Sequence, residues 1–432
     1  MQHSCRRDFT KKGTKMADQD INLQEGALDD IDIQEESDSG NEAAPDGPQR
    51  FDISSYGWDV DVEGLVKRMN REDIYLPGFQ RGFVWSATEK SRFIESLILG
   101  LPVPTLFLAR DSETQNRLNI IDGQQRLKTL QSYLNGEFSL SGKEIPEDLK
   151  GRYHSNRRAA YGERPAYPKA KVLDQADERT LSDAVVHSIV IRPNPKDDDG
   201  DLGREYNKAI IQIFKRLNTS GKALNAQEVR ASIFHGPFLR LLQELNEIED
   251  WRALFGKPHS RMKDQEAILR ALALYDGGEG YKSPMPRFLD GFMNENRNMS
   301  AEAINKLRVR FTLAIKLIRA SLGDDALKRG GTFMLTRFDA LAVGLMESLR
   351  NEHAAITPAF EEEFLQKMGE RNVHDRLNEL DADNRGLNAA GEEVEGLTLD
   401  QKGYNWSVAK FTNDTNRVVV RLNASRAVFA IA

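Results

Sequence analysis

The stretch Asn119-Ile120-Ile121-Asp122-Gly123-Gln124-Gln125-Arg126-Leu127 decides how the first half of this chain is interpreted. An apolar strand ends at Asp122, a glycine follows, and residues 125–134 are predicted to form a helix. Such a strand–turn–helix unit points backbone N–H groups outward, with the positive end of the helix dipole behind them. Gly123 has no Cβ atom, so a ligand can approach the backbone closely. The turn is therefore predicted to stabilise an anion such as a phosphate.

The side chains of this turn supply chemistry that suits a phosphate ligand. Arg126 offers a planar, bidentate donor, and Gln124 and Gln125 offer amides for a water molecule or a ribose hydroxyl. Asp122, the one carboxylate, is predicted to hold Mg²⁺ or to orient an attacking water. Asp122, Gln125 and Arg126 are the candidate catalytic residues. The structural alternative makes Asp122 a helix N-cap and Arg126 a surface salt-bridge residue.

Two further turns carry candidate ligand contacts. Gln80 and Arg81 follow Phe79 in a rigid, aromatic-rich segment that precedes a helix. A buried Arg81 needs an anionic partner, which is either Asp122 or a ligand phosphate. The turn that begins at Asn218 has the composition of a helix C-cap, and Asn218 is also a candidate for a nucleotide contact.

The pattern around these turns predicts an α+β fold, with a mixed α/β N-terminal domain followed by a mainly helical C-terminal region. Predicted strands cover 105–109, 117–121 and 184–191. A first helix is predicted over about 60–69, and a capping box, Ser86 with Glu89, opens the next one. The clearest later helices are predicted at 205–217, 226–234, 238–248, 264–275, 301–322 and 338–349.

Charge and composition divide the chain further. Residues 1–49 are predicted to be a disordered acidic tail, and Met16 is an alternative start. Residues 1–50 hold 12 acidic and 6 basic side chains, which leaves 55 acidic and 54 basic in the rest. Any nucleic-acid site must therefore be a local basic patch. Residues 50–225 are assigned to the first domain, with an irregular insertion at about 140–182, and residues 226–432 to a helical domain.

Several classes of protein are disfavoured by the same composition. No run of about 18 apolar residues predicts a membrane span, and no apolar segment follows the basic N-terminus as in a secretory signal. Cys5 is the only cysteine, so a cytoplasmic location is expected. Neither a Walker-type phosphate loop nor a Rossmann glycine motif is present.

The motifs Pro77-Gly78-Phe79-Gln80-Arg81, Trp85-Ser86, Glu95 to Pro104 and Ile121 to Leu127 together resemble the GmrSD-type N-terminal domain, a relative of the ParB/sulfiredoxin fold. The match is strong over about 70–135 and continues more weakly through 214–221 and 264–270. The resemblance implies a ParB/sulfiredoxin-like domain with a nucleotide phosphate site at Asp122–Arg126, hydrolysis of an NTP with Mg²⁺ in at least some members, and a role in DNA-directed anti-phage defence or restriction.

Larger members of that family carry an HNH-type nuclease domain that needs metal-binding histidines. Here His353 and His374 are the nearest to such a cluster, in a helix-rich stretch without the required strand pair. Cleavage of DNA would then fall to the first domain or to a partner protein. Alternatives to an NTPase are a non-catalytic, nucleotide-gated DNA-binding module and a DNA-nicking endonuclease. A homo-oligomer is left open.

The candidate DNA contact is the Arg- and Tyr-rich segment 150–171, which includes Arg152, Arg157, Arg158 and Tyr153. Arginine and tyrosine together suit contacts to the backbone and stacking on bases. The alternative is a solvated loop.

Overall fold

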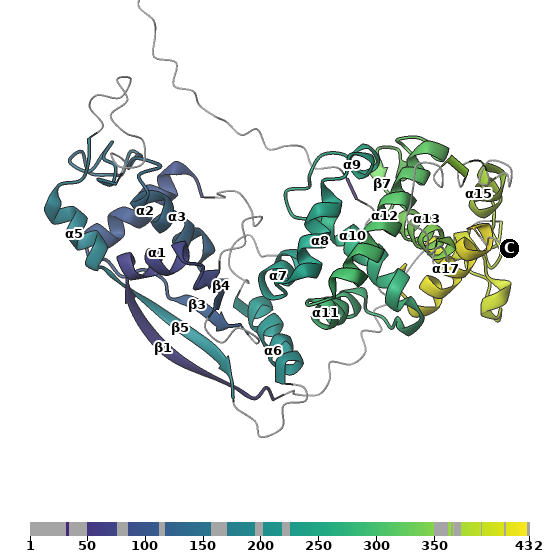
Figure 1. Ribbon diagram of the computed structural model, residues 1–432, viewed down its shortest axis with the longest axis horizontal. Coiled ribbons are helices and arrows are strands. Elements are labelled where there is room, and N and C mark those ends of the chain that lie inside the picture. Colours follow the sequence, from purple (N-terminus) through teal and green to yellow (C-terminus); the bar gives the residue numbers. More distant parts are fainter. Residues whose placement is uncertain are drawn as a thin grey trace, which may run out of the picture.

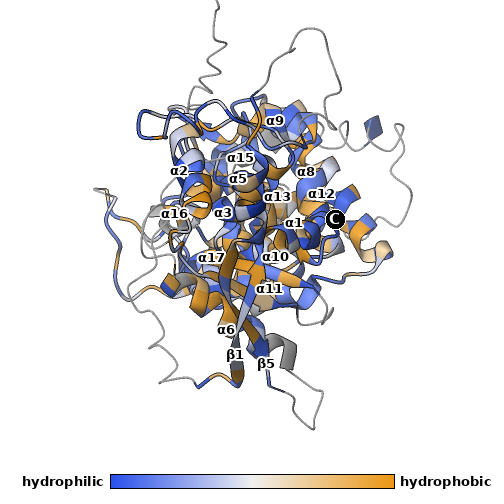
Figure 2. Ribbon diagram, turned by 90° about the vertical axis from the view of Figure 1, so that its left-hand side faces the viewer, coloured by the Kyte–Doolittle hydropathy of each residue, from blue (hydrophilic) through white to orange (hydrophobic). Residues whose placement is uncertain are grey.

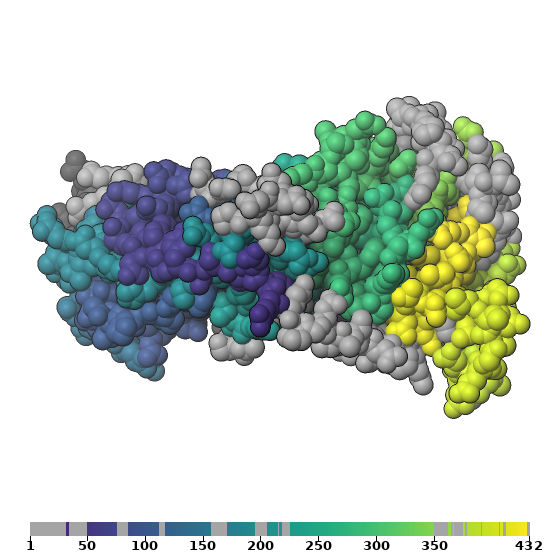
Figure 3. Space-filling model, turned by 90° about the horizontal axis from the view of Figure 1, so that it is seen from below, coloured from purple at the N-terminus to yellow at the C-terminus, as the bar shows by residue number. Residues whose placement is uncertain are grey.

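The computed structural model describes residues 32–33, 50–75, 85–111, 117–156, 171–194, 202–217, 225–349, 362–363, 366, 373–389, 391–409 and 412–429. The molecule is elongated, with a mixed α/β region in purple to teal at one end and a helical region in green to yellow at the other (Figures 1 and 3). Among the described residues, no helix is both long enough and apolar enough to cross a membrane.

One mixed sheet forms the N-terminal region, with strand order β1-β5-β3-β4-β2. The strands are β1 (Ile53–Asp61), β2 (Ile74–Tyr75), β3 (Leu106–Arg110), β4 (Leu118–Asp122) and β5 (Val185–Pro193). β1 pairs antiparallel with β5, β5 parallel with β3, β3 antiparallel with β4, and β4 parallel with β2. The predicted α+β fold is confirmed.

Four helices lie with the N-terminal sheet. They are α1 (Val62–Asn70), α2 (Ala87–Ile98), α3 (Gln124–Leu134) and α5 (Gln175–Asp183). Alternate sheet residues such as Leu106, Leu108 and Ile120 join the apolar sides of these helices in one buried cluster. The predicted capping box starts α2, because the Ser86 hydroxyl accepts from the Glu89 amide at 3.3 Å and the Glu89 carboxylate accepts from the Ser86 amide at 2.7 Å.

The other face of the sheet joins the helical region. Ala109, Ile121 and Ile191 belong to the second buried cluster, together with residues of α6 (Leu202–Leu217) and α7 (Ala226–Ile233). The Tyr206 hydroxyl on α6 donates to the Ile191 carbonyl on β5 at 3.0 Å. The sheet is therefore buried on both faces, and one core runs from it into the helices.

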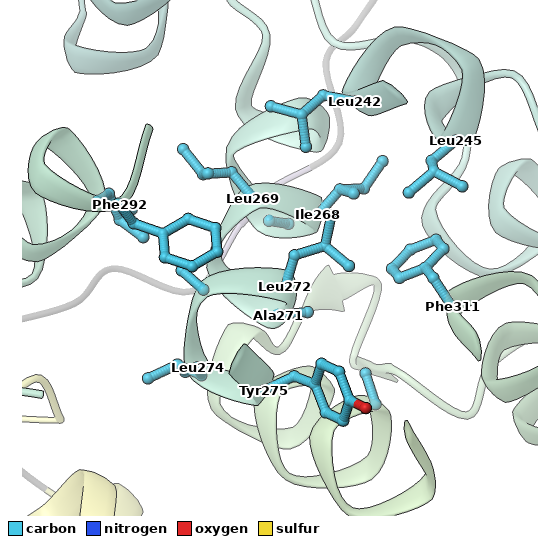
Figure 4. Close-up of a cluster of buried hydrophobic side chains, with 14 of the residues drawn as sticks. Leu242, Leu245, Ile268, Leu269, Ala271, Leu272, Leu274, Tyr275, Phe292 and Phe311 are labelled. Carbon is cyan, nitrogen blue, oxygen red and sulfur yellow. The ribbon is translucent and has the colours of Figure 1, made fainter. Parts of the chain in front are cut away.

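The helical region is built around α10 (Lys263–Gly277), whose buried side chains meet those of its neighbours in Figure 4. The other described helices of this region are α8 (Pro237–Asn246), α9 (Glu249–Phe255), α11 (Met285–Asn296), α12 (Ala301–Leu322), α13 (Leu335–Ser348), α15 (Val373–Asp381), α16 (Tyr404–Ala409) and α17 (Thr415–Phe429). Short elements complete it, namely β6 (Lys328–Arg329), β7 (Thr332–Phe333), η1 (Gly278–Gly280) and η2 (Leu399–Gln401).

Three departures from the sequence-based expectations have physical causes. The predicted first helix took in Val60 and Asp61, which end strand β1. This strand carries Gly57 and lacks a regular alternation of polar and apolar residues over its whole length, and its pairing with β5 holds it in place. The segment expected to be an irregular insertion contains α5, which has a single fully buried apolar residue, Leu181. Within the predicted disordered tail, the Asp32 carbonyl accepts from the Phe333 amide at 2.8 Å, and Ile33 bridges to Phe333.

A buried ion cluster ties together α10, α13 and α17. The Asp339 carboxylate lies 2.7 Å from an Arg270 Nη atom and 3.1 Å from one of Arg421, and all three side chains are almost fully buried. Arg421 also donates to the Thr412 carbonyl at 3.0 Å. Two arginines share one carboxylate, so the cluster depends on Asp339 for its charge balance.

Replacing Asp339 with asparagine is expected to lower the free energy of unfolding by about 3–5 kcal/mol, because two buried guanidinium groups would lose their counter-ion. Chemical denaturation measures the loss. Glu63→Gln is the matched control: Glu63 pairs with Lys67 at 2.7 Å on the exposed side of α1, and its loss should cost less than about 1 kcal/mol. Equal effects of the two substitutions would contradict this account of the cluster.

His235, just after α7, is a titratable group that burial perturbs at the junction between the sheet and the helices. Its ring packs edge-on against Tyr75 of β2, with 4.1 Å between the ring centroids. Burial, with smaller contributions from Arg297 and Arg117, lowers the pKa of His235 to about 4, although Asp111 and a hydrogen bond with the Ser232 backbone act in the opposite direction. The unfolded chain therefore binds this proton more tightly than the folded chain does.

Stability from His235 is expected to be lost as the pH falls from about 6.5 toward about 4. Between pH 7 and pH 5 this group should account for about 2 kcal/mol of lost unfolding free energy. The test is chemical denaturation of wild type and His235→Gln at pH 7 and at pH 5. The loss of unfolding free energy between these pH values should be about 2 kcal/mol smaller in the variant. Parallel pH dependence in the two proteins would show that another group is responsible.

Candidate functional site

Arg126 and Asp122 form an ion pair where β4 passes into α3. An Arg126 Nη atom lies 2.7 Å from the Asp122 carboxylate, and the other Nη donates to the Thr105 carbonyl at 3.1 Å and to the Pro104 carbonyl. The Arg126 side chain is 10% exposed and that of Asp122 is 41% exposed. Arg126 thus fixes the exposed Asp122 and ties the start of β3 to the start of α3.

Gly123 makes the sharp change of direction from strand to helix. Its φ of 105° lies in the left-handed region, and a Cβ atom there would overlap the Leu106 side chain. Gly123 is the residue at the N-cap of α3 and has no side chain to cap the helix. The structural alternative that made Asp122 the N-cap is therefore wrong, since the Asp122 side chain bonds to Arg126 instead.

Gln124 and Gln125 occupy the first turn of α3 and are half-buried. The Gln125 Oε1 atom accepts from the Trp85 amide at 3.4 Å, which links α3 to the segment that leads into α2. The Gln124 Nε2 atom is buried, and no acceptor within the described part of the chain lies in hydrogen-bond range. A buried donor without a partner costs free energy, so this atom marks a position where a ligand acceptor would be stabilised.

Lys128 is a candidate site residue that sequence reasoning missed. It lies one turn after Gln124 on α3, and burial lowers the pKa of its ammonium group. A half-buried lysine beside the first turn places positive charge where the turn is predicted to bind an anion. The i, i+4 spacing from Gln124 to Lys128 could have indicated from the sequence that the two side chains lie on the same face of the helix.

The described residues fit a nucleotide phosphate with Mg²⁺. Asp122 presents an exposed carboxylate, Gln124 a donor without a partner, and Lys128 a nearby cation. No group of three or more potential metal ligands occurs among the described residues. Mg²⁺ usually takes one or two protein carboxylates together with substrate phosphates and waters, so Asp122 alone is compatible with it.

The structure does not describe several predicted site residues. Gln80 and Arg81 fall within 76–84, Asn218 within 218–224, and Arg157 and Arg158 within 157–170. Their roles stay predictions. The link between Trp85 and Gln125 shows that the chain just after the first of these segments reaches the first turn of α3.

Lys150 and Arg152, at the start of the segment 150–171, have internal partners. Arg152 donates to the Val172 carbonyl at 2.9 Å and to the Asp148 carbonyl, and Lys150 pairs with Glu147 at 2.8 Å. Arg152 therefore holds its own loop, and a DNA contact through this segment stays a prediction for the residues between.

The weaker resemblance at residues 264–270 falls on side chains that make contacts within the helical region. Asp264 accepts from Asn246 at 3.0 Å and from Arg252 at 3.1 Å, and Arg270 pairs with Asp339. These residues hold α10 in the helical core, where they do not contact the turn at Asp122.

Gln124→Leu is expected to raise the unfolding free energy of the ligand-free protein by about 1 kcal/mol, because it removes a buried donor without a partner. The same substitution should weaken nucleotide binding about tenfold. Gln125→Leu is the matched control, since it removes the acceptor for the Trp85 amide and should lower stability. Denaturation together with nucleotide titration checks both signs, and a destabilised Gln124→Leu protein would contradict the assignment.

A comparison with protein families gives one match, over residues 62–235, which is described as the GmrSD restriction endonuclease N-terminal domain. No curated protein matches the chain. The matched segment begins with α1, includes the turn at Asp122 and ends just after α7. Residues 62–235 of this chain belong to the GmrSD restriction endonuclease N-terminal domain family.

Proposed function

We propose that this protein binds and hydrolyses a nucleoside triphosphate at the Asp122–Arg126 turn, as a component of a DNA-directed restriction or anti-phage defence system. The family match supports the part in defence. The observation that carries the nucleotide site is the exposed Asp122 carboxylate held by Arg126, beside the buried Nε2 atom of Gln124 that has no partner in the described part of the chain.

In this proposal each residue has a separate task. Arg126 donates to Asp122 and to two carbonyls, so it positions the carboxylate. Asp122 holds Mg²⁺ or a water through its exposed oxygen, and Gln124 donates to the bound nucleotide. The N–H groups of the first turn of α3 and the charge of Lys128 stabilise phosphate oxygens. Mg²⁺ would neutralise charge on the phosphates when bound.

A second candidate is a nucleotide-gated DNA-binding module without turnover. One observation favours it: Arg126, the arginine of the motif, is occupied by three acceptors. Phosphoryl transfer commonly uses a cation at the developing transition-state charge, and with Arg126 occupied, Lys128 or Arg81 would have to supply it. Binding without hydrolysis would support this candidate.

The test measures phosphate release from ATP, GTP and CTP by the full-length protein, with and without DNA and Mg²⁺. Asp122→Asn is expected to lower hydrolysis by a factor of about 10² or more, because it removes the charged oxygen that serves the metal or the water. Equilibrium binding of each nucleotide, measured in parallel, separates loss of binding from loss of turnover.

Asp59→Asn is the matched control. Asp59 is also a half-exposed aspartate at the sheet, and its carboxylate lies 2.7 Å from His187 on the neighbouring strand. Its replacement should leave hydrolysis unchanged. Equal hydrolysis by wild type and Asp122→Asn would refute the catalytic role of Asp122, and failure of all three nucleotides to bind the wild type would refute the nucleotide site.

A further inference from the structure

The outer end of the sheet carries arginines beside aromatic rings. Leu108 on β3 and Val190 on β5 face the cluster formed with α1, α2 and α3. Side chains alternate along a strand, so the residues two positions further, Arg110 and Arg192, lie on the same face. There β1 and β5 run as a long pair whose lower end in Figure 1 extends past those helices, and the pair also projects from the bottom of the molecule in Figure 2.

Arg110 and Arg192 lie side by side on neighbouring strands. The register between β3 and β5 pairs Ala109 with Ile191, so the next residue of each strand is an arginine. Tyr56 on β1 contacts both, because Arg110 donates to its hydroxyl at 3.2 Å and the Arg192 guanidinium lies 5.7 Å from its ring centroid. The tyrosine therefore places the two guanidinium groups next to each other.

The same arrangement recurs two residues along β1. The Arg68 guanidinium lies 5.3 Å from the centroid of the Trp58 ring. Trp58 and Tyr56 share one face of the strand and are about 7 Å apart along it. The rings and their arginines therefore form a row along β1 and not a single point of charge.

Arg68 and Arg192 differ from other arginines on this part of the molecule. Arg192 donates to the Ser54 hydroxyl at 3.1 Å and Arg68 to the Gly64 carbonyl at 3.1 Å, and within the described residues neither has a carboxylate at salt-bridge distance. Exposed arginines nearby do have acidic partners, in the pairs Arg71–Asp73, Arg92–Glu144 and Arg117–Glu72.

We propose that this arginine–aromatic surface, formed by Tyr56, Trp58, Arg68, Arg110 and Arg192, binds the sugar–phosphate backbone of DNA. Guanidinium groups bind phosphate oxygens bidentately, and most contacts between proteins and DNA are made to the backbone. A phosphate between Arg110 and Arg192 would accept hydrogen bonds from both guanidinium groups. The row along β1 fits a polyanion, and the choice of DNA depends on the proposed function.

The experiment titrates a short fluorescent DNA duplex with the full-length protein at several salt concentrations, with and without nucleotide. Arg110→Gln with Arg192→Gln is expected to weaken binding at low salt about tenfold or more. Loss of two phosphate contacts should also reduce the slope of log K against log salt by about 2. The control, Lys67→Gln with Arg71→Gln, removes the same charge from α1 and its C-cap, where both residues already have acidic partners, and should leave the slope unchanged.

Equal weakening by the test and control pairs would overturn the proposal, since net charge would then explain binding. The test pair should melt close to the wild type, because neither arginine is among the buried residues. A lower melting temperature with unchanged DNA affinity would make these arginines structural and overturn the proposal too. Equal competition by polyglutamate would overturn the assignment to DNA. The two proposals can fail separately. If neither the wild type nor Asp122→Asn binds nucleotide, but both bind DNA with the expected slope of log K against log salt, the proposed nucleotide site is refuted and the proposed DNA surface is supported.

Discussion

Burial of the five-stranded sheet on both faces is the constraint on which the rest of the structure depends. Alternation places Leu108 and Ile120 against the cluster with α1, α2 and α3, and Ala109 and Ile121 against the cluster with the helical region. With neither face free, a ligand can meet the sheet where a strand ends or where the covering helices stop. The turn at Asp122 is the first kind of place, and the outer end of β1 and β5 is the second.

Arginine is the residue whose role depends most on its surroundings in this protein. Arg126 is buried and donates to Asp122 and to two carbonyls, and Arg270 and Arg421 are buried around Asp339. A buried guanidinium must be paired, so these three hold the fold together. Arg192 lies exposed at the outer end of the sheet, where its contacts within the described residues are a hydroxyl and an aromatic ring.

The candidate site could be located from the sequence because its parts are adjacent in the chain. A strand, a glycine and a helix in direct succession predict the turn at Asp122, and the structure has it at that position. The partners of Arg126 could not be predicted, because Pro104 and Thr105 reach it only through the pairing of β3 with β4. Lys128 was missed for a related reason: its burial depends on what packs around α3.

The sequence by itself determined the elements with strong local signals: the capping box at Ser86, the strand–turn–helix at Asp122, and the long amphipathic helices such as α12. These signals are carried by residues a few positions apart, so they need no distant partner. Tertiary structure alone decided that residues 53–61 form a strand, that Asp339 pairs with two arginines, and that Arg110 and Arg192 follow a paired position on neighbouring strands. Each of these depends on strand register or on burial between distant segments, which local sequence does not encode.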